Sequence, residues 1–171
     1  MTSMVRASLR AKSAEAKTDT RASRVLAVDY GRKRIGLALS DELGLTAQPL
    51  ATLERKNRRD DMKRLRAICE NYCVARILVG HPVHMTGEAG EMSAEAAQFA
   101  AKVRKETGIE TELVDERLTS WEAKQTVAET KSRTRRKDES IDAIAAAVLL
   151  RDYLEHQSQS KQAHHTRKDQ E

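Results

Sequence analysis

The sequence of this 171-residue chain predicts one α/β domain, in which helices cover a mixed β-sheet. Two short apolar runs joined by a brief basic turn come first, which is typical of an antiparallel hairpin. Further along, apolar runs of strand length alternate with segments of helical period, which is typical of parallel strands with crossover helices. The length fits a single domain, since most domains have about 100–200 residues.

The first half is predicted to hold strands at residues 25–29, 35–40 and near 50–53, and then a helix from Asp60 or Asp61 to about Cys73. Gly31 and Gly36 in the first hairpin allow either a plain turn or a close approach by another backbone. The two cysteines, Cys69 and Cys73, are predicted to fill apolar space, because their spacing suits a helix better than a disulfide or a zinc site.

The second half is predicted to hold a strand at residues 76–80, a helix at 93–106, a strand at 109–114, a helix opened by a capping box of Thr119 and Glu122, and a last helix from Ser140 to Leu154. Hairpin strands followed by crossover units imply a five-stranded sheet, with three antiparallel strands first and parallel strands after them. This topology is that of the ribonuclease H-like fold.

The folded domain is predicted to span residues 24–155, between disordered tails at residues 1–23 and 156–171. Residues 1–24 have six Lys and Arg and two acidic residues, whereas residues 25–155 have 22 of each sign. The tail therefore carries most of the formal charge of +5. Because the longest apolar run, residues 143–150, is too short to cross a bilayer, the chain is predicted to be cytoplasmic and to have no membrane partner.

Cationic side chains cluster in three places, at residues 32–34, 55–59 and 131–137. Each cluster by itself is more typical of a solvated loop. Clusters that share one face would suit a polyanion such as a nucleic acid.

Acidic side chains lie at the ends of three predicted elements. Asp29 follows a buried strand, Asp115 and Glu116 follow another, and Asp142 lies in the first turn of the last helix. Functional groups in open α/β sheets gather beyond the carboxyl ends of strands, where carboxylates repel one another unless a cation compensates their charge. A few oxygen ligands are typical of Mg²⁺ or Mn²⁺, and two such ions about 4 Å apart can activate a water and stabilise the leaving oxygen of a phosphodiester.

Each carboxylate also has an ordinary interpretation. On residue type alone, Asp142 is better explained by the helix dipole. It nevertheless borders the predicted buried face of its helix, which comprises Ile141, Ile144, Ala145, Val148 and Leu149. Asp115 and Glu116 can be solvated or paired with Arg117. Asp29 is the strongest candidate, because an apolar strand rarely places a charge at its buried end.

Four motifs, AVDYGRKRIGLALSD, ILVGHPVHMTGE, VDERLTSWEA and IDAIAAAVLL, closely resemble the YqgF family of pre-16S rRNA nucleases, also described as Holliday junction resolvases. The resemblance covers residues 24–154. It implies a metal-dependent endonuclease that acts in trimming the 5′ end of the 16S rRNA precursor, with the ribosome or a pre-ribosomal particle as a partner. Matched residue by residue, it implies that Asp29, Glu116 and Asp142 form the catalytic and metal-binding site.

One loop departs from the family pattern, because His84 replaces the usual Asn and Thr86 the usual Asp. Pro82 between two histidines, with no cysteine near them, argues against a zinc site there. The residues predicted to contact the substrate are Arg32, Lys33, His84, Arg117, Arg133, Arg135 and Arg136.

Other functions stay open on sequence grounds. An actin-like ATP-binding protein would share the Asp-x-Gly hairpin, but it needs two such domains and this chain has room for one. A non-catalytic RNA-binding ribosome-assembly factor could use the same fold. The loop altered at His84 and Thr86 keeps that alternative open. RNA and branched DNA cannot be told apart here, because contacts to a phosphate backbone carry no base information.

Overall fold

The computed structural model describes residues 24–81, 90–115 and 141–168. The elements in chain order are β1 (Arg24–Tyr30), β2 (Arg34–Ser40), β3 (Ala47–Glu54), α1 (Arg58–Asn71), β4 (Val74–His81), α2 (Glu91–Thr107), β5 (Glu110–Asp115) and α4 (Ile141–Lys168). The helix predicted to open at Thr119 lies outside these residues.

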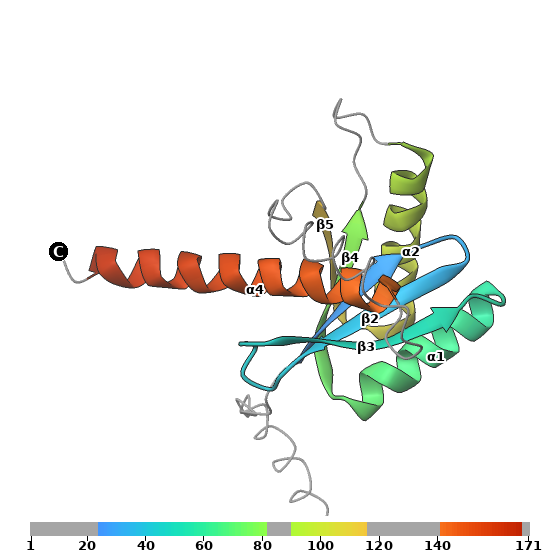
Figure 1. Cartoon of the computed structure of the whole chain (residues 1–171), viewed down its shortest axis with the longest axis horizontal. Helices are drawn as coiled ribbons and strands as arrows, with labels where there is room; N and C mark the ends of the chain where they lie inside the picture. The colour runs from blue at the N-terminus through green and yellow to red at the C-terminus, as the bar shows by residue number, and fades with distance from the viewer. Residues whose placement is uncertain (1–23, 82–89, 116–140, 169–171) are drawn as a thin grey trace, which may run out of the picture.

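The strands form one sheet in the order β3-β2-β1-β4-β5. Strand β2 is antiparallel to both β1 and β3, whereas β4 is parallel to β1 and to β5. The predicted mixed sheet, antiparallel on one side and parallel on the other, is therefore confirmed (Figure 1).

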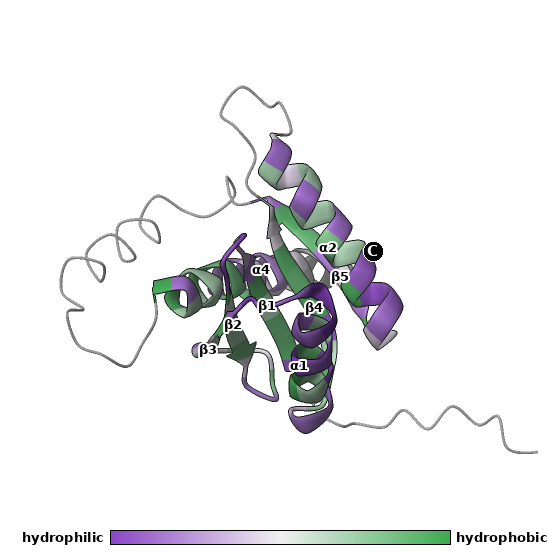
Figure 2. Ribbon diagram, turned by 90° about the vertical axis from the view of Figure 1, so that its right-hand side faces the viewer, coloured by the Kyte–Doolittle hydropathy of each residue, from purple (hydrophilic) through white to green (hydrophobic). Residues whose placement is uncertain are grey.

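One face of the sheet carries the larger apolar side chains and packs on α1 and α2. Alternate residues of the central strands point to this face, so Leu26 and Val28 of β1 and Ile77 and Val79 of β4 lie in one buried cluster. The helices contribute Met62, Leu65, Cys69, Ala96, Phe99, Ala100 and Val103. Figure 2 shows the corresponding hydrophobic stretches on the strands beneath the two helices.

The opposite face of the sheet carries smaller side chains and packs on α4. Ala27 and Ala38 are fully buried there with Ala146 and Leu150 of the helix. Because small residues let two backbones approach closely, α4 lies directly across the strands (Figure 1). Arg76 at the start of β4 anchors the helix further along, since it donates a hydrogen bond of 2.9 Å to the hydroxyl of Tyr153.

Helix α1 starts differently from the prediction. Its N-cap is Asn57, whose side-chain oxygen accepts a 2.9 Å hydrogen bond from the amide of Asp60, so the predicted caps Asp60 and Asp61 lie inside the helix. Asp61 is turned inward, with 1% of its side chain exposed, and pairs with Arg55 and Arg64 at 3.0 Å each. The sequence does not indicate this burial, because the partner Arg55 precedes the helix and meets it only through folding.

Two expectations for the last helix were wrong. The helix does not end at Leu154 but continues to Lys168, because residues 155–168 contain neither the Gly nor the Pro that would end it. Of the residues expected on the buried face, Val148 and Leu149 are buried, whereas Ile141 is 41% exposed and Ile144 and Ala145 are only partly buried. Ala143, Ala146 and Leu150 complete the buried face. The limits of the folded domain and the disorder of residues 1–23 stay predictions.

Within the described ranges, no helix is long and apolar enough to cross a membrane. Both cysteines are free thiols. Cys69 is part of the core, as predicted, and burial raises its pKa to about 11, which keeps the thiol protonated at neutral pH. Cys73 is exposed, so the prediction that it fills apolar space was wrong.

Replacing Asp61 with Ala should destabilise the fold, because Arg55 and Arg64 would lose the carboxylate that they share inside the protein. Removing one partner of a buried ion pair costs about 3 kcal/mol in the free energy of unfolding, measured by urea denaturation. Asp60→Ala is the matched control, since Asp60 is exposed and its helix-dipole contribution is below about 1 kcal/mol. Equal losses in the two variants would contradict the role given to Asp61.

Candidate functional site

Asp29 lies at the carboxyl end of the central strand β1, on the face that α4 covers. Successive residues of a strand point to opposite faces. Val25 and Ala27 belong to the cluster beneath α4, whereas Leu26 and Val28 belong to the cluster beneath α1 and α2. Asp29 follows in the first series, so its carboxylate points to the α4 side, where it is partly buried.

Gly36 of β2 is the point where α4 meets the sheet. A Cβ atom added to Gly36 would overlap the carbonyl group of Asp142 and would lie 2.9 Å from the backbone nitrogen of Ala143. The first turn of α4 is therefore in direct backbone contact with β2, which only glycine permits. The sequence left a close approach open at Gly36, and the structure assigns it to the last helix.

This contact brings two of the predicted carboxylates together. Gly36 is the partner of Asp29 in the antiparallel ladder, where paired Cα atoms are about 5 Å apart. The helix residue that lies on Gly36 is Asp142. Asp29 and Asp142 therefore lie side by side at the end of β1, although they are 113 positions apart in the sequence.

Arg34 contacts one of these carboxylates. Its Nε atom lies 2.8 Å from Oδ2 of Asp142, whose side chain is 25% exposed. Arg34 and Gly36 are two residues apart in β2 and therefore point to the same face. The interaction supplies a positive charge where two acidic groups meet, which lowers their mutual repulsion. Arg34 was not predicted as a site residue, because its partner comes from a distant helix.

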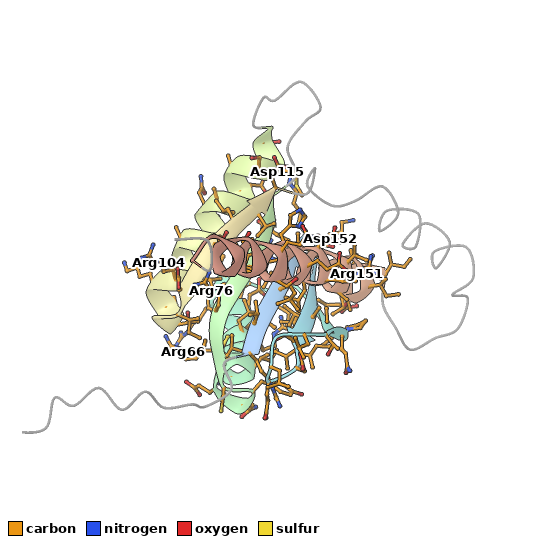
Figure 3. The ribbon with its side chains drawn as sticks, turned by 90° about the vertical axis from the view of Figure 1, so that its left-hand side faces the viewer. Arg66, Arg76, Arg104, Asp115, Arg151 and Asp152 are labelled. Carbon is orange, nitrogen blue, oxygen red and sulfur yellow. The ribbon has the colours of Figure 1, made fainter. Side chains whose placement is uncertain are left out.

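The end of β5 lies at the same end of the sheet. Gly80 of β4 pairs with Val114 of β5, and Val28 of β1 pairs with Val79 of β4, so the three strands end at similar levels. Asp115, labelled in Figure 3, is the last residue of β5. Val114 belongs to the cluster beneath α4, and Asp115 therefore points to the other face. Glu116 follows it and lies outside the described residues.

In the described part of the chain, no three His, Cys, Asp or Glu side chains group as metal ligands do. The pair Asp29 and Asp142 supplies two of the three predicted ligands, and both are hard oxygen donors of the kind that Mg²⁺ and Mn²⁺ prefer. These donors fit a divalent cation, and a third carboxylate would complete a predominantly carboxylate set.

Two of the predicted substrate contacts, Arg32 and Lys33, lie within the described residues. Arg32 points toward α2, where its guanidinium donates to Glu91 at 2.8 Å and Glu95 at 2.7 Å. Hydrogen bonds from Arg32 lower the pKa of Glu95, so this carboxylate stays ionised at neutral pH. Lys33 is exposed in the turn between β1 and β2. The remaining predicted contacts, His84, Arg117, Arg133, Arg135 and Arg136, lie outside the described residues.

Comparisons with known proteins agree with this architecture. The model of the RuvX family, described as a Holliday junction resolvase, matches residues 23–156. A relative from Koribacter versatilis, described as a candidate pre-16S rRNA nuclease, is 40% identical over 132 residues, which are 77% of this chain and 86% of the relative. One with the same description from Geobacillus kaustophilus is 42% identical over 134 residues, 77% of this chain and 97% of the relative.

Among solved structures, the fowlpox virus resolvase in complex with its substrate, Holliday junction DNA, has a TM-score of 0.50 at 11% identity, over 78% of this chain and 97% of that chain. At this identity the likeness concerns the fold alone. It supports the ribonuclease H-like arrangement of the sheet and its helices.

Replacing Gly36 with Ala should push the first turn of α4 away from β2. Such overpacking costs about 2 kcal/mol in the free energy of unfolding, and amide hydrogen exchange in the first two turns of α4 should become faster. Gly44→Ala is the control, because Gly44 has a positive φ of 66° but the nearest atom to an added Cβ there, Leu154 Cδ2, is 3.9 Å away. It should cost about 1 kcal/mol of backbone strain and leave exchange at the start of α4 unchanged. Unchanged exchange in Gly36→Ala would contradict the contact.

Proposed function

The chain belongs to the RuvX family of Holliday junction resolvases, and from this membership and the geometry of the site we propose that it is a divalent-metal-dependent endonuclease that acts in 5′-end processing of pre-16S rRNA. Asp29, Glu116 and Asp142 are its proposed catalytic carboxylates. A hydrolase of this kind cleaves a phosphodiester bond with water as the nucleophile.

The main observation behind the proposal is that Asp29 and Asp142 lie side by side at Gly36. The two come from opposite ends of the domain, and a glycine is needed to bring them together. A contact required only for stability would not need to place a second carboxylate beside the first, because like charges at close range raise the free energy of the folded state. An arrangement that accepts this repulsion is typical of a functional site.

Divalent ions held by such carboxylates would activate a water and stabilise the leaving oxygen of the phosphodiester. Asp29, on a central strand, gives one ligand a rigid position. Asp142, on the first turn of α4, gives a second one whose position is set by the contact with Gly36. Arg34 orients the carboxylate of Asp142 and partly neutralises it before substrate and metal arrive. In this proposal Glu116 completes the ligand set from the residue after β5.

The substrate proposal rests on relatives that are 40% and 42% identical to this chain over the aligned residues and are described as candidate pre-16S rRNA nucleases. The ribosome or a pre-ribosomal particle is then the proposed partner, and the cytoplasm the proposed location. A four-way DNA junction is the second candidate substrate, because the matching family model is described as a Holliday junction resolvase. Both substrates would present phosphodiesters to the same carboxylates.

Asp29→Asn, Glu116→Gln and Asp142→Asn should each lower the rate of cleavage about a thousandfold. Loss of a metal ligand removes several kcal/mol of transition-state stabilisation, and each 1.4 kcal/mol is worth about a factor of ten. Circular dichroism and substrate affinity should change little. Asp60→Asn is the control, since Asp60 is also an aspartate in a first helical turn but lies on α1. Cleavage at the wild-type rate in any of the three variants would remove that residue from the site.

The substrate can be identified by incubating the pure protein with a 16S rRNA precursor or with a four-way DNA junction, each in Mg²⁺, Mn²⁺ or Ca²⁺. We expect cleavage of the precursor near its 5′ end with Mg²⁺ or Mn²⁺. Little cleavage is expected with Ca²⁺, which is larger and takes six to eight ligands in a less regular geometry. Cleavage of the junction alone would favour the resolvase activity. Absence of cleavage with both would favour a non-catalytic RNA-binding factor.

A further inference from the structure

A cavity of about 480 Å³ opens on the face of the sheet opposite to the candidate active site. It lies between Tyr30 at the end of β1, the connection at residues 55–57, and helices α1 and α2. Neither the family match nor the proposed chemistry assigns it a role. We call it the α1–α2 cleft. Its volume is in the range of small-molecule sites, which are about 300–1,000 Å³.

The lining of the α1–α2 cleft is strongly cationic, with five cationic and two acidic side chains. Both acidic side chains are already engaged. Asp61 pairs with Arg55 and Arg64, and Glu95 pairs with Arg32. The remaining positive charge is therefore available to a ligand.

Two of the cations, Lys56 and Arg58, stand exposed at the rim of the cleft. Neither forms an ion pair with any acidic residue that the structure describes, and a third lining cation, Lys102, has only a long contact of 4.0 Å with Glu106. Exposed cations that converge on a concave surface attract anions, and phosphate is the anion that a nucleic-acid enzyme meets.

The floor of the cleft is partly aromatic and is connected by hydrogen bonds. The rings of Tyr30 and Phe99 are 4.9 Å apart, and the guanidinium of Arg55 lies 4.9 Å from the centre of the Tyr30 ring. Arg55 also donates hydrogen bonds to the Tyr30 hydroxyl at 3.0 Å and to the carbonyl of Gly31 at 3.1 Å. The two rings are tilted by 44° to one another, and the planar guanidinium of Arg55 covers the Tyr30 ring. Planar aromatic and guanidinium groups beneath a cationic rim suit a nucleotide, which combines a planar base with a phosphate.

The cleft and the candidate active site meet at the end of β1. Asp29 and Tyr30 are consecutive, so they point to opposite faces of the sheet. The cations that follow also point to opposite faces. Arg34 pairs with Asp142 on one face, and Arg32 pairs with Glu95 on the other. A nucleic-acid strand bound at Asp29 would reach the cleft by passing around the turn between β1 and β2.

We propose that the α1–α2 cleft is a second nucleotide site, which binds a phosphate-bearing nucleotide of the substrate strand beside the one cleaved at Asp29. This inference rests on the proposed function. The phosphate lies between Lys56 and Arg58, and the base lies toward Tyr30. The cleft adds affinity and fixes the direction of the strand, while the carboxylates on the other face carry out the cleavage.

The test compares two charge-reversal variants of equal net charge. Lys56→Glu with Arg58→Glu alters the rim of the cleft, and Arg59→Glu with Lys63→Glu alters exposed cations of α1 that do not line it. Binding of a fluorescein-labelled RNA hexanucleotide is followed by anisotropy in EDTA, so no cleavage occurs. The rim variant should bind about tenfold more weakly, and the slope of log K against log salt should shrink by about 0.7 for each lost phosphate contact. The control variant should change affinity less than about twofold.

Equal losses in the two variants would overturn the proposal, since they would show non-specific attraction only. Adenosine 5′-monophosphate should compete with the hexanucleotide and adenosine should not, and equal competition would exclude a phosphate site. In cleavage assays the rim variant should raise KM about tenfold and leave kcat unchanged. An unchanged KM beside lost monophosphate binding would make the cleft a site for free nucleotides, contrary to the proposal. A wild-type protein that cleaves nothing would contradict the proposed function but not the anisotropy result.

Discussion

The backbone contact between Gly36 and the first turn of α4 governs the arrangement of the site. A side chain at that position would occupy the space of the Asp142 carbonyl, so the helix could not begin where it does. Because Gly36 is paired with Asp29 in the sheet, the same contact places Asp142 beside Asp29. Ala27 and Ala38 continue this surface of small residues under Ala146 and Leu150 of the helix. A single close crossing of helix and sheet therefore sets the distance between groups from the two ends of the domain.

The two faces of the sheet have different roles. One face holds the larger part of the apolar core, and the other holds the candidate catalytic carboxylates. The face beneath α1 and α2 buries the larger side chains, such as Leu26 and Ile77, and each such side chain contributes about 1.5–3 kcal/mol when removed from water. The face beneath α4 buries mainly small residues and ends in the carboxylates. Changes in the carboxylates therefore leave the larger core intact, which is why their effect on activity can be separated from an effect on folding.

Some cationic side chains that cluster in the sequence are paired with acidic side chains in the folded protein, so they offer less positive charge to a ligand. The basic turn between β1 and β2 looks like one cationic cluster, but Arg32 is held by Glu91 and Glu95 and Arg34 by Asp142. Their role is to join the turn to the helices on both faces. Lys56 and Arg58, which have no acidic partner in the described ranges, carry more of the available positive charge. The distribution of acidic partners, and not the number of cations, decides where a polyanion is attracted.

The sequence alone determined the strands, their mixed pairing and Asp29 as the carboxylate at the end of a buried strand, because these depend on local periodicity and on the few connections that short loops allow. It could not determine the inward turn of Asp61, the exposure of Ile141, the partners of Arg32 and Arg34, or the extension of α4 to Lys168. The partners and burial of these side chains depend on contacts between distant segments, whose geometry no local pattern encodes. The extension of α4 depends on the absence of Gly and Pro from residues 155–168. Those residues have no periodic apolar face from which a helix could be predicted. For Asp142, the sequence indicated the position in the first turn of a helix. Only the contact of α4 with Gly36 in the folded protein placed Asp142 beside Asp29.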